Sequence, residues 1–269
     1  MDDDGVMRLL AVDWSGDLRA AASRIRVAEA RPGELLGVRG GLDRAGVGGL
    51  VLDLRDGPAP VVVGMDFSFG LPGWFPTGRG ATTLPALWDL ARDEGEDWLR
   101  ACEPPFWGRA GTRKPADVPL YRRTELDARD RGLNPLSTFQ VGGAGAVGTG
   151  SIRGMALLGA WRRAGVGVWP LDPAPGPRGV LVVEIYPRAF TGPVVKSSAP
   201  ARRAQVDADP RIPAELREAA TATEDAFDAA YAALGMAEHE SVLAALPAAT
   251  DPASLLEGRI WLPPPGLRG

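Results

Sequence analysis

Acidic residues follow several apolar runs in this chain, and their type and placement suit metal or phosphoryl chemistry. The runs 7–13, 60–66 and 179–184 end in Asp13, Asp66 and Glu184. Nearly continuous apolar runs of this length are typical of buried strands. In open α/β sheets, sites form at the carboxyl ends of parallel strands. The three carboxylates are therefore expected to converge if these strands are adjacent and parallel.

A second pair of acids, Asp225 and Asp228, lies on a predicted helix over 213–234. Residues three apart share a helix face, and the alanines of this face indicate that it packs against the protein. Two like charges there repel each other, and a hard cation would remove the repulsion. Oxygen-only clusters suit Mg²⁺ or Mn²⁺. Two such ions about 4 Å apart can activate water and stabilise the leaving oxygen in phosphodiester hydrolysis.

Four of the acids also have a purely structural interpretation, whereas a turn-forming role is less natural for Glu184, which ends an apolar run before Tyr186-Pro187. An aspartate at a strand end is often a turn former or a helix cap, and this applies to Asp13 and, more strongly, to Asp66, which precedes Ser68 and Gly70. Asp225 and Asp228 alone fit a solvated helix face equally well. The occurrence of all five acids in this strand order favours a shared site.

Composition limits the alternatives. The chain has 269 residues, 45% hydrophobic and 24% charged, with a formal net charge of -4, so any polyanion site must be local. One cysteine, Cys102, and one histidine, His239, argue against a disulfide framework, a His/Cys zinc site and a His-based triad. The acidic N-terminus is unlike a signal peptide, and no apolar run approaches the ~18 residues of a membrane span. A cytoplasmic protein without a membrane partner is expected.

The elements that position these acids form an α/β pattern. Hairpin strands followed by alternating units predict a mixed sheet with helices on both faces, in a single domain over 1–269. Residues from about 104 to 150 have little periodicity and form a predicted Arg/Gly-rich insertion, interpreted as a partly mobile lid. The predicted strands are 7–13, 23–28, 34–38, 60–66, 166–169 and 179–184, and the predicted helices are 42–54, 84–102, 151–163, 213–234 and 238–246.

The insertion is locally basic, and its cations are candidates for gripping substrate phosphates. Aromatic side chains between them offer possible base-stacking surfaces. The alternative is an arginine-rich surface loop encoded by a GC-rich genome. The candidate substrate-binding residues are Arg109, Arg113, Lys114, Arg122 and Arg123, and the interleaved aromatics are Phe106, Trp107 and Tyr121.

A glycine-rich stretch, 142–150, follows in the same insertion. It superficially fits G-x-G-x-x-G, but no strand leads into it and no lysine follows as in a P-loop. A hinge, or a turn that approaches substrate, is the preferred interpretation. Ser151 is expected to be the N-cap of the next helix. Cys102 is expected to be a packed thiol and His239 a surface residue.

Five short motifs occur in an order that resembles a known family. The motifs are Ala11-Val-Asp-Trp-Ser-Gly16, Gly64-Met-Asp-Phe-Ser-Phe-Gly-Leu-Pro72, Val183-Glu-Ile-Tyr-Pro187, Glu224-Asp-Ala-Phe-Asp-Ala-Ala230 and Glu257-Gly-Arg-Ile-Trp-Leu-Pro263. They resemble an uncharacterised prokaryotic family of predicted nucleases (domain of unknown function four-two-nine). The resemblance covers nearly the whole chain and implies a ribonuclease H-like fold. One departure is Glu224, where the family often has histidine.

The helix pattern Asp-x-x-Asp-Ala also looks like that of Holliday-junction resolvases. That likeness implies a metal set of Asp13, Asp225 and Asp228 with Glu184 or Asp66. The leading hypothesis is a two-metal-type nuclease in which Asp13 bridges Mg²⁺ or Mn²⁺ ions. Glu184 and Asp228 complete the shells, while Asp66 and Asp225 are primary or outer ligands. The alternatives are a nucleotide phosphohydrolase or phosphotransferase, and a non-catalytic module that binds nucleic acid or protein.

Overall fold

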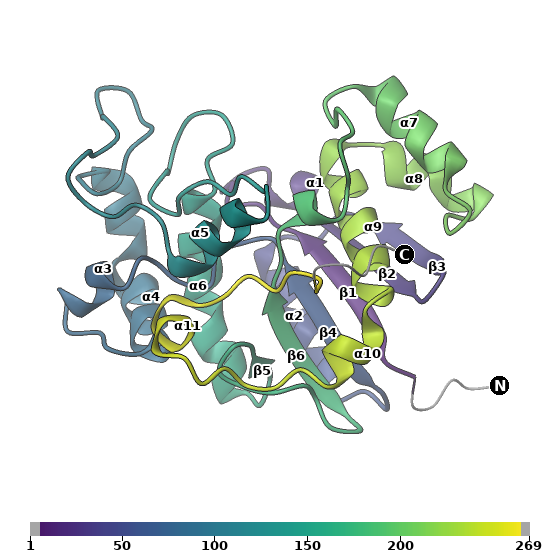
Figure 1. The fold of residues 1–269 in the computed structure, drawn as a ribbon, viewed down its shortest axis with the longest axis horizontal. Coiled ribbons are helices and arrows are strands. Elements are labelled where there is room, and N and C mark those ends of the chain that lie inside the picture. Colours follow the sequence, from purple (N-terminus) through teal and green to yellow (C-terminus); the bar gives the residue numbers. More distant parts are fainter. Residues whose placement is uncertain (1–5, 265–269) are drawn as a thin grey trace.

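A six-stranded mixed sheet forms the centre of the molecule in a computed structural model, which describes residues 6–264 (Figure 1). The spatial order of the strands is β3-β2-β1-β4-β6-β5. Strands β1, β4 and β6 are parallel neighbours, β5 runs parallel to β6, and β2 is antiparallel to both β1 and β3. The strands are β1 (Arg8–Asp13), β2 (Arg26–Arg31), β3 (Glu34–Arg39), β4 (Pro60–Met65), β5 (Gly167–Val168) and β6 (Gly179–Glu184). The three acid-bearing strands β1, β4 and β6 are adjacent and parallel, which meets the condition set for the convergence of their acids.

Helices cover both faces of this sheet, as the alternating pattern predicted. Helix α9 lies across β1, β2 and β3 on one face, and α2, α4 and α6 lie on the other (Figure 1). Two short 3₁₀ turns cover 187–189 and 214–216. The helices are α1 (Ala21–Arg24), α2 (Arg44–Arg55), α3 (Trp74–Thr77), α4 (Leu84–Ala101), α5 (Arg123–Asp130), α6 (Gly148–Arg163), α7 (Ala199–Ala208), α8 (Arg217–Thr221), α9 (Glu224–Ala237), α10 (Glu240–Ala244) and α11 (Pro252–Glu257).

Side-chain alternation along the central strands divides the interior into two cores. In β1, Leu10 and Val12 pack toward α2, α4 and α6, whereas Leu9 and Ala11 pack toward α9. Because successive strand residues point to opposite faces, the same rule governs the acids that end each strand. The face that each carboxylate occupies is therefore fixed by its position in the apolar run.

Gly64 in β4 leaves room for side chains that pack between β4 and α9. A Cβ at Gly64 would lie 2.6 Å from Met236 Sδ and 2.9 Å from Ile185 Cδ1. Contacts that short do not occur between real side chains, so a larger residue would require the side chains of Met236 and Ile185 to shift. Gly64 thus permits the packing of Met236 of α9 against β4.

Several predicted boundaries differ from the structure. The helix expected over 213–234 is broken, because Thr223 adopts extended φ and ψ and accepts a capping hydrogen bond from Ala226 N, which starts α9 anew. The expected strand 23–28 begins only at Arg26, after the short helix α1. The segment between the predicted strand 179–184 and the predicted helix 213–234 contains α7, a helix that the sequence analysis missed. Ser198 caps it, and Pro200 stands in its first turn.

The predicted insertion, 104–150, is anchored in the core. Phe106 and Phe139 lie within the larger hydrophobic cluster, where each ring contacts Phe75 at centroid distances of 5.4 and 5.3 Å. The stretch contains one helix, α5, and is otherwise irregular. Across 6–264, none of the helices has the length and hydropathy that a membrane crossing requires.

Candidate functional site

Asp13 and Asp66 lie side by side at the carboxyl edge of the sheet. The parallel register pairs Val12 with Met65, so the next residue on each strand places Asp13 beside Asp66. Both continue the side-chain phase of residues that pack toward α9, namely Leu9 and Ala11 on β1 and Val62 on β4. Asp13 is buried and Asp66 is partly exposed. The two carboxylates therefore face the helix that carries the third acid.

Helix α9 supplies Asp228 to the same place from above the sheet. Asp228 is only 7% exposed, and its Oδ2 forms an ion pair with Lys196 Nζ. Its other oxygen, Oδ1, is buried and has no hydrogen-bond partner within the described chain. Asp225 lies one turn earlier and is half-buried. A buried carboxylate oxygen without a partner costs free energy unless another group satisfies it.

The pKa values of all four carboxylates are raised, in each case chiefly by burial. Burial raises the pKa of Asp13 well above its usual range, and the charges of Asp66, Asp228 and Asp225 raise it further, while Lys196 opposes them. Burial and the charge of Asp228 raise the pKa of Asp66 to about 7. The pKa values of Asp225 and Asp228 are also raised, chiefly by burial. The cluster therefore retains protons near neutral pH unless a cation neutralises it.

Glu184 points to the other side of the sheet, because it continues the phase of Val180 and Val182 rather than that of Leu181 and Val183. There Arg122 donates to both of its oxygens, at 2.9 Å from Nη1 to Oε2 and 2.5 Å from Nη2 to Oε1. Phe69 N donates to Oε2 at 2.8 Å. Glu184 was predicted to be a metal ligand. In the structure it is the buried ion-pair partner of Arg122, and it also lines the cleft that contains Asp13 and Asp66, so its role as a ligand stays a prediction.

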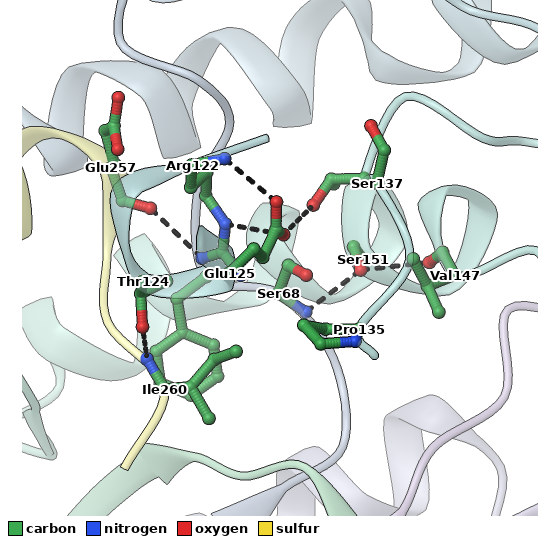
Figure 2. Close-up of polar contacts among 12 residues, drawn as sticks. Ser68, Arg122, Thr124, Glu125, Pro135, Ser137, Val147, Ser151, Glu257 and Ile260 are labelled. Atoms are coloured by element: carbon green, nitrogen blue, oxygen red, sulfur yellow. Dashed lines mark hydrogen bonds and ion pairs between the residues drawn. The ribbon is translucent and has the colours of Figure 1, made fainter. Parts of the chain in front are cut away.

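Arg122 was predicted to contact substrate, and the structure gives it a different role. Its side chain is 0% exposed and also donates to Glu125 Oε1 at 3.0 Å and to the Glu257 carbonyl at 3.1 Å (Figure 2). These bonds join the end of β6, the start of α5 and the end of α11. The pKa of Arg122 is raised because the attraction of Glu184 and Glu125 outweighs the opposing effect of burial. Arg122 therefore fastens three segments together beneath the cleft.

The remaining candidate substrate residues are dispersed. Arg109 lines the cleft above the carboxylates, and its side chain is exposed. Arg113, Lys114 and Arg123 are exposed but lie outside the lining of the cleft. Lys114 Nζ lies 5.7 Å from the ring centroid of Tyr121, and Arg123 pairs with Asp127. Of the five predicted basic contacts, only Arg109 is both exposed and at the site.

The carboxylates lie in a cleft of about 960 Å³. One wall is the loop after β1, and the other is the glycine-rich stretch 142–150, which continues into α6. The two walls touch: Trp14 Nε1 donates to Gly150 O at 3.0 Å, and a Cβ on Gly16 would lie 2.5 Å from Gly150 N. This close backbone approach explains the glycine at position 16, whereas a Cβ on Gly150 would lie at an ordinary contact distance of 3.5 Å from Gly16 N. The interpretation of 142–150 as a turn near substrate agrees with its place in the cleft wall.

Sequence reasoning missed four basic residues of the cleft, one of which is Arg153, paired with Glu96. Lys196 faces the carboxylate cluster, and Arg19 and Arg24 line the cleft near the β1 loop. One signal for Lys196 was available. The chain has two lysines, Lys114 and Lys196, while arginine supplies every other basic residue. Lys196 is therefore unusual in this composition, and it is the lysine that lies beside the acidic cluster.

Three single-residue predictions have clear outcomes. Cys102 is a buried free thiol, as expected. His239 was expected at the surface but is buried, with Nδ1 2.9 Å from Gly235 O. Ser151 does not cap α6, which begins at Gly148; its hydroxyl donates to Val147 O and accepts from Ser68 N, both at 2.9 Å (Figure 2). Ser151 thereby holds the turn that follows Asp66.

The donor set suits a hard divalent cation, although the side chains are not arranged around a common point. Within 6–264, no group of three or more His, Cys, Asp or Glu side chains has the arrangement of a metal site. Two of the acids are already paired with basic side chains: Glu184 with Arg122 and Asp228 with Lys196. The unpartnered Asp228 Oδ1 and the mutual repulsion of Asp13 and Asp66 are what a bound cation would relieve.

Comparison of the chain with protein-family models, with curated proteins and with solved structures gives no match.

Proposed function

We propose that this protein is a divalent-metal-dependent phosphodiesterase that hydrolyses nucleic acid, with Asp13, Asp66 and Asp228 at its centre. The observation that carries the proposal is the convergence of these acids in one cleft, where Asp228 Oδ1 has no hydrogen-bond partner within the described chain. Asp13 and Asp66 would hold Mg²⁺ or Mn²⁺ together with that oxygen, and Asp225 would act from the outer shell. We also propose a ribonuclease H-like fold, which the mixed sheet with parallel β1, β4 and β6 supports.

The residues of the cleft have separate tasks in this proposal. When bound, a divalent cation supplies charge that offsets the phosphodiester and lowers the pKa of water. Without a cation, burial and the charge of Asp228 raise the pKa of Asp66 to about 7, and a bound divalent cation would lower that pKa and hold Asp66 in its ionised, ligating form. Exposed Arg109 is placed to contact a phosphate, and the glycine-rich wall lets a bulky substrate approach the backbone closely.

The test measures cleavage of single- and double-stranded DNA and RNA oligonucleotides, and hydrolysis of nucleoside triphosphates, with Mg²⁺, with Mn²⁺ and with a chelator. Metal-dependent oligonucleotide cleavage is expected. Asp13→Asn should reduce kcat/KM at least about 100-fold, which corresponds to about 2.7 kcal/mol of transition-state stabilisation. Asp53→Asn, at an exposed position of α2, is the matched control and should retain activity.

Three results would contradict the proposal. Full activity of Asp13→Asn would remove the carboxylate cluster from the mechanism. Turnover of free triphosphates without oligonucleotide cleavage would favour a nucleotide phosphohydrolase on the same site. Absence of calorimetric binding of either ion would favour a non-catalytic binding module.

A further inference from the structure

A second cavity, of about 1030 Å³, lies between α7, the second half of α9 and the stretch 262–264. Its described lining residues and those of the cleft that holds the carboxylates form separate sets. A volume of this order is typical of small-molecule sites, which combine a mostly apolar lining with a few placed polar groups. The cavity is therefore a candidate ligand site apart from the proposed active site.

The charged side chains of this cavity neutralise one another. Arg211 donates from Nε and Nη2 to Asp209 at 2.9 and 2.6 Å, and its Nη1 pairs with Glu238. Arg131, which is exposed, donates from Nη1 to the Pro263 carbonyl at 3.0 Å. Two acids and two arginines leave no net charge among the described lining residues. The lining therefore gives no net attraction to an anion or a cation, and a charged ligand would lose hydration on entering it.

Apolar side chains form most of the remaining lining. They include Leu133 and Leu262, and Phe190 lies among them, partly exposed. Two contacts fix the Phe190 ring: it stacks on Trp261 at a centroid distance of 6.1 Å, and a Cβ on Gly235 would lie 2.3 Å from Phe190 Cδ1. Gly235 thus lets the ring lie against the backbone of α9. A ligand with an apolar body would remove these surfaces from water, which is favourable.

His239 provides a polar group that a ligand can bind. It lines the cavity, its side chain is 6% exposed, and its Nδ1 lies 2.9 Å from the Gly235 carbonyl oxygen. A carbonyl oxygen only accepts, so in the neutral ring Nδ1 carries the hydrogen and Nε2 is a hydrogen-bond acceptor. Nε2 makes no hydrogen bond within residues 6–264. A mostly buried acceptor without a partner costs free energy, and an N–H or O–H group of a ligand would satisfy it.

We propose that this cavity binds a small uncharged molecule with an apolar body and an N–H or O–H donor, and that the donor bonds to His239 Nε2. The proposal gives a role to the one histidine of the chain, which lies outside the lining of the carboxylate cleft. Because the two sets of lining residues are separate, the proposal does not depend on the hydrolytic function proposed above.

The single histidine makes a nuclear magnetic resonance test specific to this site. In untagged protein with isotopically labelled histidine, every imidazole signal comes from His239. Indole, which has an apolar ring system and one N–H, should shift the Nε2 signal saturably, with a dissociation constant on the order of 1 mM. N-methylindole lacks the donor and should bind about fivefold more weakly. A carboxylate derivative of indole that keeps the N–H should also bind more weakly than indole, because its charge loses hydration.

Two matched variants on α7 locate the site. Ala208→Trp fills the cavity from an exposed lining position and should abolish the shift, whereas Ala204→Trp, exposed on the same helix but outside the lining, should leave it unchanged. The absence of a saturable shift up to about 10 mM indole would overturn the proposal. Equal affinities for indole and N-methylindole would overturn the role of His239, and tighter binding of the carboxylate would overturn the uncharged class. Binding that persists in Ala208→Trp would place the ligand outside this cavity and contradict the proposal.

Discussion

At the scale of single residues, Asp66 and Glu184 show how equivalent sequence positions acquire opposite roles. Each comes at the end of a buried parallel strand, and the two strands are neighbours. Asp66 points toward α9 and has a raised pKa, whereas Glu184 points away and is bonded by Arg122 and Phe69 N. The difference of one residue in where the acid falls decides the face, because side chains alternate along a strand.

Removing the charge of Glu184 should therefore affect stability more than metal binding. Glu184→Gln leaves Arg122 buried with only Glu125 as an ionic partner, and breaking such a pair costs about 3–5 kcal/mol. Urea denaturation should show this loss, while the dissociation constant for Mn²⁺ should change by less than about twofold, well under 1 kcal/mol.

The matched control is Glu34→Gln, which removes an exposed ion pair with Arg31. It should cost less than about 1 kcal/mol. A large loss of Mn²⁺ affinity in Glu184→Gln, with unchanged stability, would show that Glu184 is a ligand after all.

At the scale of elements, the cluster depends on how closely α9 lies on the sheet. Thr223 starts the helix with a capping bond at the point where the preceding helix ends, and this aims the first turn, with Asp225 and Asp228, at the ends of β1 and β4. Gly64 permits the packing of Met236 of α9 against β4 on the sheet side. Two small features of the sequence, a threonine cap and a strand glycine, therefore bring carboxylates from distant segments together.

Enlarging Gly64 should disrupt this packing. Gly64→Ala places a methyl group 2.6 Å from Met236 Sδ, and overpacking of this kind costs about 1–3 kcal/mol. Thermal denaturation should show a lowered Tm, because the side chains of Met236 and Ile185 must leave their packed positions. Gly37→Ala in β3, where a Cβ would meet nothing within 4 Å, is the matched control and should have little effect. Equal Tm values for the two variants would contradict this account.

At the scale of the whole molecule, the fold gathers acidic side chains in one cleft. Burying these like charges together lowers the free energy of unfolding. Four carboxylates with raised pKa values surround a single lysine, while two other acids, Glu184 and Glu125, share Arg122 below them. Clusters of this kind are typical of functional sites, because a protein optimised for stability alone has no reason to assemble them. The penalty should be visible in the pH dependence of unfolding.

Without a metal, stability should fall as the pH rises from 3.8 to about 7. The folded protein binds a proton at Asp66 with a pKa of about 7, against 3.8 for the ordinary group, so the folded state holds more protons between these values. The contribution of the Asp66 proton to the free energy of unfolding is therefore complete below pH 3.8 and is lost as the pH rises through about 7. In a chelator, the free energy of unfolding of the wild-type protein should drop from pH 5 to pH 8 by on the order of 2 kcal/mol more than that of Asp66→Asn. Identical pH profiles would contradict the raised pKa.

The sequence by itself determined the main elements of the sheet and the candidate acids. Apolar runs bounded by turn-forming residues predicted β1, β4 and β6. Such a run is recognised from neighbouring residues of the sequence alone. The pattern of strands and helices also predicted the mixed sheet with helices on both faces. The sequence pattern did not predict α7 or the break before α9. Each depends on one capping residue, Ser198 or Thr223, whose signal extends over only a few residues.

Only the tertiary structure decided which acids share a site and which cations serve them. Asp13, Asp66 and Asp228 face one another across the space between sheet and helix, and Lys196 reaches them from a segment with no periodic signal. Arg122, grouped by sequence with exposed lid arginines, is buried against Glu184. Partner choice of this kind depends on contacts between residues far apart in the chain. Burial and ion pairing, which set the charge of each group, exist only once those contacts have formed.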